Sequence, residues 1–299
     1  MKNYISKATL VAFAMGLFFV FSACEKQDLT ADVGSSDVGV VLDVDQNDRI
    51  DRIINLPDNV RKGIEQRATT RGLDLNLMEE KVVTRPTGEV EKVYVVEGDI
   101  EMTPHQFREM MMEQDGDRQY STNITANPNQ TYTVIGYTGS CCALTSRMRT
   151  ALSWAVANYN RENLNISLSL SYSSGTNADI VVYNNGASGG GGSAGFPYSN
   201  GDPYKWVQIN AGTDAFGTNV VEHVICHEIG HCLGFRHTDW YNRSISCGSG
   251  GSEGSAGVGA NLIPGTPSLD NQSIMLSCFS SNEDGEFSNL DVVALEYLF

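Results

Sequence analysis

The stretch HEIGHCLGFRH, residues 227–237, holds three of the five histidines in this chain of 299 residues. In a helix with 3.6 residues per turn, His227 and His231 lie on one face, about 6 Å apart. Two imidazoles at this spacing can bind one zinc ion. Gly234 tolerates the left-handed conformation that ends a helix, so the chain can turn there and bring His237 to the metal as a third ligand. The stretch therefore predicts a metal-binding helix followed by a sharp turn.

Glu228 lies next to the first of these histidines and suits the role of general base for water at the metal. Three protein ligands leave the fourth zinc position open for water, as catalytic zinc requires. The alternative is a helix that carries its histidines for packing alone. The full pattern H-E-x-x-H-x-x-G-x-x-H, however, arises by chance on the order of once in 10^5 chains of this length. The spacing thus favours metal-assisted hydrolysis.

HEIGHCLGFRH resembles the extended zinc signature of the metzincin metallopeptidases. Its HEIGH core, followed by CLGFRHTD, is most similar to the bacterial dual-action HEIGH metallopeptidases. SIMLS, residues 273–277, is similar to the methionine turn of these enzymes, which implies that Met275 packs beneath the metal. The resemblance covers about residues 131–299 and implies a zinc endopeptidase with one catalytic Zn2+.

The same resemblance implies an α+β fold with a twisted mixed sheet, an active-site helix, a methionine turn and a C-terminal helix, preceded by a small propeptide-like segment. The protein or peptide substrate would add as a further strand to an edge strand in the cleft. We expect that edge strand within Ala194–Tyr204.

The sequence departs from the metzincin pattern at Ser277, where some members have a tyrosine that also binds zinc. Asp239 follows His237 by two residues, and an aspartate replaces the third histidine in related sites. We expect His237 to be the ligand and Asp239 to support the site from outside the ligand set. His223, one turn before His227, either extends the row of histidines or points past the metal as an ordinary helix residue, and we expect the latter.

Two other functions remain open from the residues alone. The chain could be a binding or adhesion lipoprotein with a structural zinc ion, but structural zinc usually has four protein ligands and no adjacent base such as Glu228. It could also be a zinc hydrolase that acts on a non-protein substrate, because spacing does not name the bond that is cut. Activity that survives chelation of the metal would contradict both catalytic interpretations.

The N-terminus has the layout of an export signal. Lys2 and Lys7 flank the start, residues 8–21 are apolar, and small residues precede Cys24. This end resembles a bacterial lipobox, which implies cleavage before Cys24 and a lipid-modified N-terminus. An ordinary signal peptide with an incidental cysteine is the alternative. We expect an exported lipoprotein at the outer membrane, the cell surface or in the periplasm, with release on maturation as the alternative to lasting attachment.

Composition divides the rest of the chain into four parts. Residues 25–60 are polar and acidic and predict a flexible tether. Residues 61–118 predict a propeptide-like region, with a strand at 91–100 and a helix at 103–114. Residues 119–130 predict a linker, and Arg118 beside it is an accessible site for a protease. The catalytic domain is expected over residues 131–299.

Glu97-Gly98-Asp99-Ile100 resembles the aspartate-switch motif of astacin propeptides, with Val96 in place of the aromatic residue. The resemblance implies that Asp99 occupies the open metal position and keeps the enzyme latent. A plain turn at the end of a strand is the alternative, because Gly-Asp is common in turns.

Periodicity predicts the elements of the last part. Alternating or continuous apolar residues predict strands at 131–137, 166–173, 178–184 and 206–210. Helical spacing predicts helices over 144–159 and 288–299, the second capped by Ser288. Glycine-rich loops are expected at 186–195 and 248–260, and the first has neither the lysine nor the residue order of a phosphate-binding loop.

Six cysteines follow Cys24, and an even number in an exported protein indicates a disulfide framework. Six cysteines can be joined into disulfides in 15 ways. The one pair that we expect is Cys247 with Cys278. The net charge of -16 excludes the basic surface that nucleic-acid binding and docking on anionic lipid require. The family resemblance implies a peptide substrate as partner, and the lipobox implies a membrane reached through the lipid anchor. We expect the protein itself to be monomeric.

Overall fold

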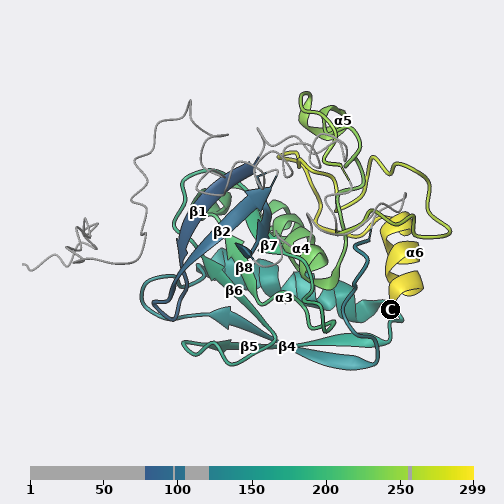
Figure 1. Ribbon diagram of the computed structural model, residues 1–299. Coiled ribbons are helices and arrows are strands. Elements are labelled where there is room, and N and C mark those ends of the chain that lie inside the picture. Colours follow the sequence, from purple (N-terminus) through teal and green to yellow (C-terminus); the bar gives the residue numbers. More distant parts are fainter. Residues whose placement is uncertain (1–77, 97, 105–120, 255–257) are drawn as a thin grey trace, which may run out of the picture. The chain divides into compact units, whose positions relative to one another are not determined.

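Eight strands within the described residues form one mixed sheet, and helices pack on it (Figure 1). The computed structural model describes residues 78–96, 98–104, 121–254 and 258–299. The strands are β1 (Met78–Thr84), β2 (Val90–Val96), β3 (Ile100–Met102), β4 (Gln130–Tyr137), β5 (Ile166–Ser173), β6 (Ile180–Asn184), β7 (Gly192–Gly195) and β8 (Trp206–Ile209). The helices are α3 (Ser146–Arg161), the 3-10 helix η3 (Ala211–Ala215), α4 (Thr218–Leu233), α5 (Ser244–Cys247) and α6 (Asn289–Leu298). The expected α+β class with a mixed sheet is confirmed.

The strand order is β1-β2-β3-β7-β8-β6-β4-β5. β4 pairs in parallel with β5 and β6, and β6 pairs in parallel with β8. β7 runs antiparallel to β8. On its other side β7 pairs in parallel with β3, and Ile100 lies opposite Ala194. The strands of residues 78–102 thus extend the sheet that residues 130–209 build.

The predicted elements of residues 131–299 form for the expected local reasons. Four residues of β6, Ile180 to Tyr183, are all buried, because this strand has neighbours on both sides and is covered on both faces. The hydroxyl of Thr145 accepts a hydrogen bond from the Met148 amide and caps α3. Ser288 caps α6 in a reciprocal capping box with Asp291. Sequence periodicity and capping were therefore sufficient to locate these segments.

Helix α4 lies inside the molecule. It packs on β7 and β8 and against α3, and every residue from Val220 to Leu233 is buried. A helix that is buried all round belongs to a protein interior rather than to a surface. One continuous apolar cluster surrounds it and includes side chains from β4, β6, α3, α4 and α6. The segment with the histidine motif is thus held on all sides.

The front strands β1, β2 and β3 are attached mainly through polar groups. Their buried apolar side chains, among them Val93, Val95 and Ile100, lie outside the apolar cluster described above. Arg85, 1% exposed, forms an ion pair of 3.1 Å with Glu101, which is fully buried. The attachment therefore depends on buried charges as well as on the pairing of β3 with β7.

Residues of the later strands and their connections complete this ion pair. The hydroxyl of Tyr204 donates to Glu101 at 3.0 Å, and Gln208 donates to the same carboxylate through its side-chain amide. Arg85 in turn donates to the Tyr183 hydroxyl at 3.2 Å. A buried ion pair needs such additional hydrogen bonds to offset the cost of removing both charges from water.

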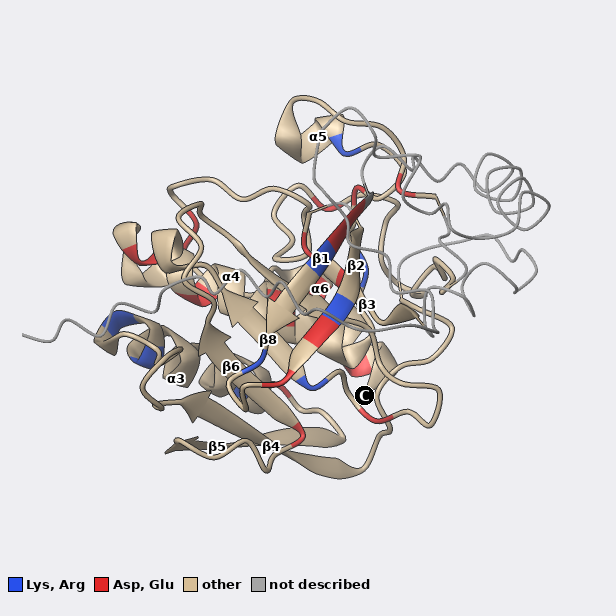
Figure 2. Cartoon of the chain, turned by 60° about the vertical axis from the view of Figure 1, so that its left-hand side comes forward, with Lys and Arg blue, Asp and Glu red and all other residues tan. Residues whose placement is uncertain are grey.

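Strand β1 forms one edge of the sheet and carries charges along it (Figure 2). Lys92 of β2 reaches Glu80 of β1 at 2.6 Å, and Lys81 lies 3.2 Å from Glu79. Charged side chains on an edge strand discourage pairing with another chain.

The structure differs from the sequence expectations in two strands: the strand expected at 91–100 ends at Val96 as β2, and β7 was not expected. Residues 192–195, expected as part of a glycine-rich loop, form β7. The edge strand expected within Ala194–Tyr204 overlaps β7 only at its end, and β3 covers this strand in the full chain. Glycine masks the strand pattern because it has no side chain to alternate. A Cβ at Gly195 would lie 2.5 Å from the carbonyl oxygen of Glu101, so this close pairing requires glycine.

Several expectations fall on residues that the structure does not describe. They are the signal segment 1–24 with Cys24, the tether 25–60, Arg118 and most of the helix expected at 103–114. Within the described residues, none of the helices is both long and apolar enough to cross a membrane.

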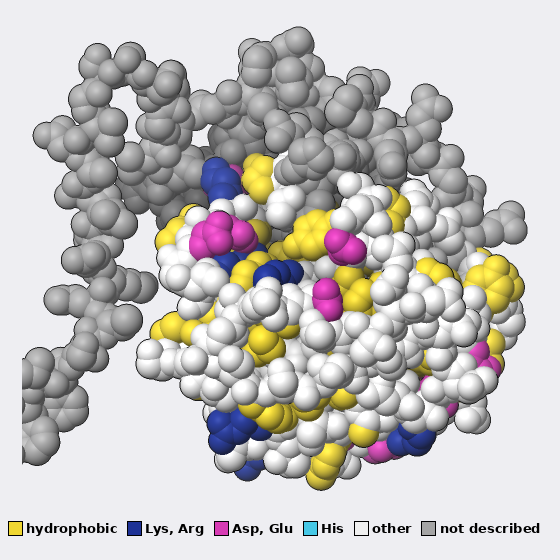
Figure 3. Space-filling model, turned by 90° about the horizontal axis from the view of Figure 1, so that it is seen from below, with side chains coloured by type: hydrophobic (Ala, Val, Ile, Leu, Met, Phe, Trp, Pro, Cys, Tyr) yellow, Lys and Arg dark blue, Asp and Glu magenta, His cyan; other side chains and the backbone are white. Residues whose placement is uncertain are grey.

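Figure 3 shows one face of the molecule, on which acidic and basic side chains are interspersed and the apolar ones lie in small groups. This face has no continuous basic patch among the described residues.

Candidate metal centre and active site

Three imidazole rings meet at one point beside α4. His227 and His231 lie one turn apart on the helix, and their ring centroids are 4.6 Å apart. Gly234 ends the helix in the left-handed conformation, with φ of 110° and its amide donating to Gly230 and His231. The chain turns there and brings in His237, whose Nε2 lies 3.2 Å from the Nε2 atoms of both other histidines. The structure thus assembles the three histidines that the motif singles out.

Each of these histidines has its Nδ1 atom held by an acceptor. His227 Nδ1 lies 2.8 Å from the carbonyl oxygen of Ile274, and His231 Nδ1 lies 2.8 Å from that of Phe235. His237 Nδ1 lies 2.6 Å from Glu253 Oε1. An acceptor at Nδ1 places the proton there and leaves the Nε2 lone pair for a metal. Three Nε2 atoms so arranged fit a transition metal such as zinc.

Glu253 is the residue at this centre that the sequence did not reveal. It belongs to the glycine- and serine-rich stretch 248–260, yet it is fully buried. Besides His237, it contacts Arg236 at 3.3 Å and Arg243 at 3.5 Å. A single acidic residue in a loop has no periodicity or spacing that relates it to a histidine 16 positions earlier, so only the folded chain could identify it.

Asp99 from the front segment lies at the same point. Its Oδ2 atom is 3.2 Å from His237 Nε2 and 3.8 Å from His227 Nε2. Together with His231, these residues form a group whose ligand atoms all lie within 4.8 Å of one another. Burial alone would raise the pKa of the Asp99 carboxyl, but the histidines, His237 foremost, hold this pKa well below its usual range. The carboxylate is therefore the fourth potential ligand of the centre.

The turn between β2 and β3 positions Asp99. Gly98 has φ of 102°, a conformation that favours glycine, and lets the chain turn toward the histidines. The carbonyl oxygen of Asp99 then accepts a hydrogen bond of 2.9 Å from the Ala194 amide of β7. The placement of this carboxylate is thus coupled to the β3–β7 pairing.

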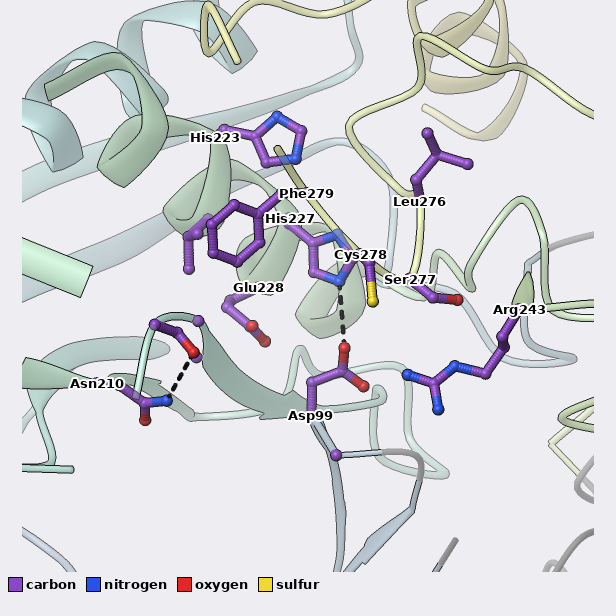
Figure 4. Close-up of a pocket in the computed structure, with 15 residues that line it drawn as sticks. Asp99, Asn210, His223, His227, Glu228, Arg243, Leu276, Ser277, Cys278 and Phe279 are labelled. Carbon is purple, nitrogen blue, oxygen red and sulfur yellow. Dashed lines mark hydrogen bonds and ion pairs between the residues drawn. The ribbon is translucent and has the colours of Figure 1, made fainter. Parts of the chain in front are cut away.

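Glu228 faces the same centre from a cavity of about 270 Å³ (Figure 4). Its carboxylate is buried, and its Oε2 atom has no hydrogen-bond partner. Burial, and then the nearby Asp99, raise the pKa of Glu228 well above its usual range. A Cβ at Gly192 would lie 2.8 Å from Glu228 Oε1, so the glycine of β7 allows the sheet to pass close to this carboxylate. The side chain is positioned to accept a proton from a molecule in the cavity.

Met275 packs beneath the histidine helix, where the methionine turn was expected. Its backbone oxygen accepts a hydrogen bond of 2.8 Å from the Thr238 amide, next to His237. A Cβ at Gly230 would lie 2.6 Å from Met275 Sδ, which explains the glycine of the HEIGH stretch. The turn and the helix are thus in direct van der Waals contact.

Asp239 is fully buried but contacts none of the three histidines. Its two carboxylate oxygens accept hydrogen bonds from the hydroxyls of Ser277 at 2.8 Å and Ser246 at 2.6 Å. The Ser277 hydroxyl also lies 3.0 Å from Glu253, which holds His237. Asp239 therefore joins the methionine turn to the loop after the third histidine, and the carboxylate that orients His237 is Glu253.

His223 does not join the metal group. It lines the cavity one turn before His227 (Figure 4), and burial lowers its pKa to about 4, so it is neutral at neutral pH. This position agrees with the expectation that His223 is an ordinary helix residue outside the ligand set.

The cysteines form one disulfide rather than the expected framework of three. Cys247 and Cys278 are joined, as expected. Cys226 and Cys232 are buried thiols six residues apart on α4, so they project from different faces of the helix and cannot meet. Cys141 and Cys142 are adjacent and form no disulfide, although their sulfurs lie 2.8 Å apart.

Comparison with known families assigns the chain to one of them. The family described as dual-action HEIGH metallo-peptidase matches residues 93–299. The chain belongs to this family. As a member, it is a metallopeptidase, a hydrolase that uses a bound metal and acts on peptides. The matched stretch begins at Val93, so it includes Asp99 as well as the three histidines.

Two solved structures of myroilysin are similar to this HEIGH metallopeptidase at low identity. One is 15% identical, covers 59% of this chain and 96% of its own chain, and has a TM-score of 0.40. The other is 16% identical, covers 67% of this chain and 97% of its own chain, and has a TM-score of 0.37. No curated protein matches the chain.

We expect Glu253→Gln to weaken metal binding by roughly 10- to 100-fold, because the carboxylate orients the third histidine and increases its basicity. Titration of the metal against a competing chelator measures the affinity, with circular dichroism to verify folding. Glu296→Gln, on the exposed face of α6, is the matched control and should bind metal like the parent. Equal affinities for the two variants would contradict the assigned role of Glu253.

Proposed function

We propose that this HEIGH metallopeptidase is a zinc-dependent endopeptidase of the metzincin type, with His227, His231 and His237 as ligands. The observation that carries the proposal is the convergence of three Nε2 atoms next to a buried carboxylate, Glu228, that has an unpartnered oxygen. Bound zinc would supply a Lewis acid that lowers the pKa of water and polarises the peptide carbonyl. Nitrogen ligands in this number suit zinc better than the oxygen-preferring ions.

Glu228 performs the proton transfers in this proposal. It accepts a proton from the attacking water and later delivers it to the leaving nitrogen of the cleaved bond. Its burial supports this role, because a raised pKa brings a carboxyl group closer to the range in which it both accepts and returns a proton at neutral pH. A structural zinc site does not require a proton acceptor such as Glu228, so the binding-protein alternative is not favoured.

The substrate would bind as a strand along β7. This strand has antiparallel β8 on one side, and in the full chain β3 occupies its other side. A peptide that replaces β3 would find the same backbone donors and acceptors, including the Ala194 amide that now bonds to Asp99. The scissile bond would then lie near Glu228, since Gly192 of the same strand is close to this carboxylate.

The front segment would keep the enzyme latent by two means. Asp99 takes a position where water would bind, and β3 covers the strand on which the substrate would lie. Removal of the segment by cleavage near Arg118 would release both the metal position and β7. Cleavage is expected before residue 121, because residues 121–126 of the expected linker bond to Asn261, Gly234 and Leu233. The polar attachment of β1, β2 and β3 supports a detachable segment, because they share little of the main apolar cluster.

The change Glu228→Gln should abolish peptide cleavage, on the order of 10²- to 10⁴-fold, while the metal stays bound, because only the proton acceptor is lost. Residues 25–299 are incubated with zinc, and intact mass is followed beside metal content. The parent chain is expected to trim itself in the linker, and the Gln variant to remain whole with one zinc ion. Trimming at the same rate in both would contradict the role of Glu228, as would parental activity that survives chelation.

The change Asp99→Ala should open the metal position while β3 remains anchored by Arg85 and Glu101. We expect the untrimmed variant to cleave a peptide at least about tenfold faster than the untrimmed parent, because a carboxylate no longer competes with water for the metal. Initial rates on a fluorogenic peptide measure this, with Asp284→Ala as an exposed control. Equal rates in parent and Asp99→Ala would leave β3 as the sole barrier and contradict the switch.

Export and lipid attachment at Cys24 complete the proposed function. The signal layout and the small residues before Cys24 support them, and the disulfide between Cys247 and Cys278 suits an oxidising compartment. The enzyme would work as a monomer at the membrane it is anchored to. The mass of the N-terminal peptide from expressing cells checks the lipid, and an unmodified cysteine there would contradict it.

A further inference from the structure

Arg243 lies in the wall of the active-site cavity. The residues that line this cavity include Asp99, His227 and Glu228, and Arg243 is the only lysine or arginine among them. In Figure 4 the Asp99 carboxylate lies between Glu228 on one side and the guanidinium of Arg243 on the other. The cavity therefore has a proton acceptor and a permanent positive charge on opposite sides of the point where the histidines converge.

The guanidinium of Arg243 has most of its hydrogen-bonding capacity unused. Its side chain is only 14% exposed, and its one ion pair among the described residues joins Nε to Glu253 at 3.5 Å. The structure gives this side chain no hydrogen bond, and Nε is buried without one. A largely buried cation is costly unless its donors find a partner. The free donors of Arg243 face a cavity that, in a peptidase, receives the substrate.

Ser277, the other polar side chain on this wall, is already engaged. Its hydroxyl lies between Asp239 at 2.8 Å and Glu253 at 3.0 Å. It cannot donate its single proton to a substrate without losing these contacts. Arg243 is therefore the donor that remains on the side of the cavity opposite Glu228.

We propose that Arg243 is a catalytic residue that binds the carbonyl oxygen of the scissile peptide bond and stabilises the negative charge that develops there. The inference rests on the proposed function. When water adds to the carbonyl carbon, the π electron pair moves to the oxygen, and Glu228 takes one proton from the water. The oxygen gains charge facing Arg243. The pair then returns to form the carboxyl group, the C–N bond breaks, and the nitrogen receives the proton from Glu228.

The surroundings of Arg243 keep it aligned with the metal centre. Glu253 contacts both Arg243 and His237, so one carboxylate fixes the cation relative to the third histidine. Arg243 directly precedes α5, and Cys247 at the end of α5 is bonded to Cys278, the residue after Ser277. A donor that is fixed before the reaction stabilises developing charge without having to reorganise.

The test uses residues 25–299 with Asp99→Ala, which frees the metal position, after a protease has cut near Arg118 so that β3 can leave β7. To this protein it adds Arg243→Met, Arg243→Lys or the control Arg161→Met. Arg161 is 53% exposed and makes surface ion pairs far along α3. Four quantities are measured for each variant: kcat and KM on an uncharged fluorogenic peptide, zinc content, and calorimetric affinity for a phosphinate isostere of that peptide. The affinity for the uncleaved peptide is measured after addition of Glu228→Gln.

For Arg243→Met we expect kcat to fall by on the order of 10²- to 10³-fold, the loss typical of one oxyanion donor. Phosphinate affinity should fall by a similar factor, because this compound resembles the transition state. KM, zinc content and affinity for the uncleaved peptide should stay within about threefold of the parent, since the contact forms mainly in the transition state. Arg243→Lys should recover part of kcat, and Arg161→Met should leave all values unchanged.

Other outcomes would overturn the inference. Equal losses of phosphinate and peptide affinity would make Arg243 an ordinary substrate-binding residue. A loss confined to peptides with acidic side chains would make it a specificity residue, and loss of zinc would make it structural. If the cleaved Asp99→Ala parent, from which β3 can detach, neither cleaves the peptide nor binds the phosphinate, the proposed function itself fails, and this inference fails with it.

Discussion

Three imidazole rings can direct their Nε2 atoms to one point only if something else holds each ring by its Nδ1 atom. In this protein the three acceptors come from three different parts of the chain: the turn just after the helix, the loop that carries Glu253, and the methionine turn at Ile274. Much of the described chain after α4 has no regular secondary structure, yet it is anchored by these contacts. The metal centre therefore organises the C-terminal part of the fold as much as the fold positions the centre.

Buried polar groups connect the separate parts of this molecule. Asp239 joins two loops through Ser246 and Ser277, and Glu253 joins His237 to two arginines. The front strands are attached in the same way, through Arg85 and Glu101. Such contacts require exact partners and lose most of their stabilisation when one partner leaves. A segment held by them can be firmly placed and still separate as a unit, which a shared apolar core would prevent.

Local sequence patterns predicted what depends on local geometry. Histidine spacing on a helix, a glycine that ends it, and alternation in β5 are properties of neighbouring residues, and each is present in the structure. Met275 was predicted through its resemblance to a methionine turn, and it lies against Gly230. Asp99 was also singled out, and the structure brings it to the histidines. Its role as a latch remains a proposal.

Contacts between distant residues were not predictable in this way. Glu253 and Arg243 lie in loops without periodicity, and only folding brings them to the histidines. β7 was assigned to a loop because Gly192 and Gly195 give no alternation of side chains, although these glycines are what allows Glu228 and β3 to approach. The framework of three disulfides was wrong because a cysteine count does not reveal that Cys226 and Cys232 are both inside one buried helix.

The disulfide between Cys247 and Cys278 restricts the compartments in which the active centre can be complete. It ties α5, which follows Arg243, to the segment after the methionine turn, and no strand pairing joins these two segments. Such a bond persists only where thiols are oxidised, and reducing surroundings would keep both sulfurs as thiols. A newly made chain in reducing surroundings would thus have its histidine helix but not this disulfide. Passage into an oxidising compartment would then be a step of assembly, separate from any removal of the front segment.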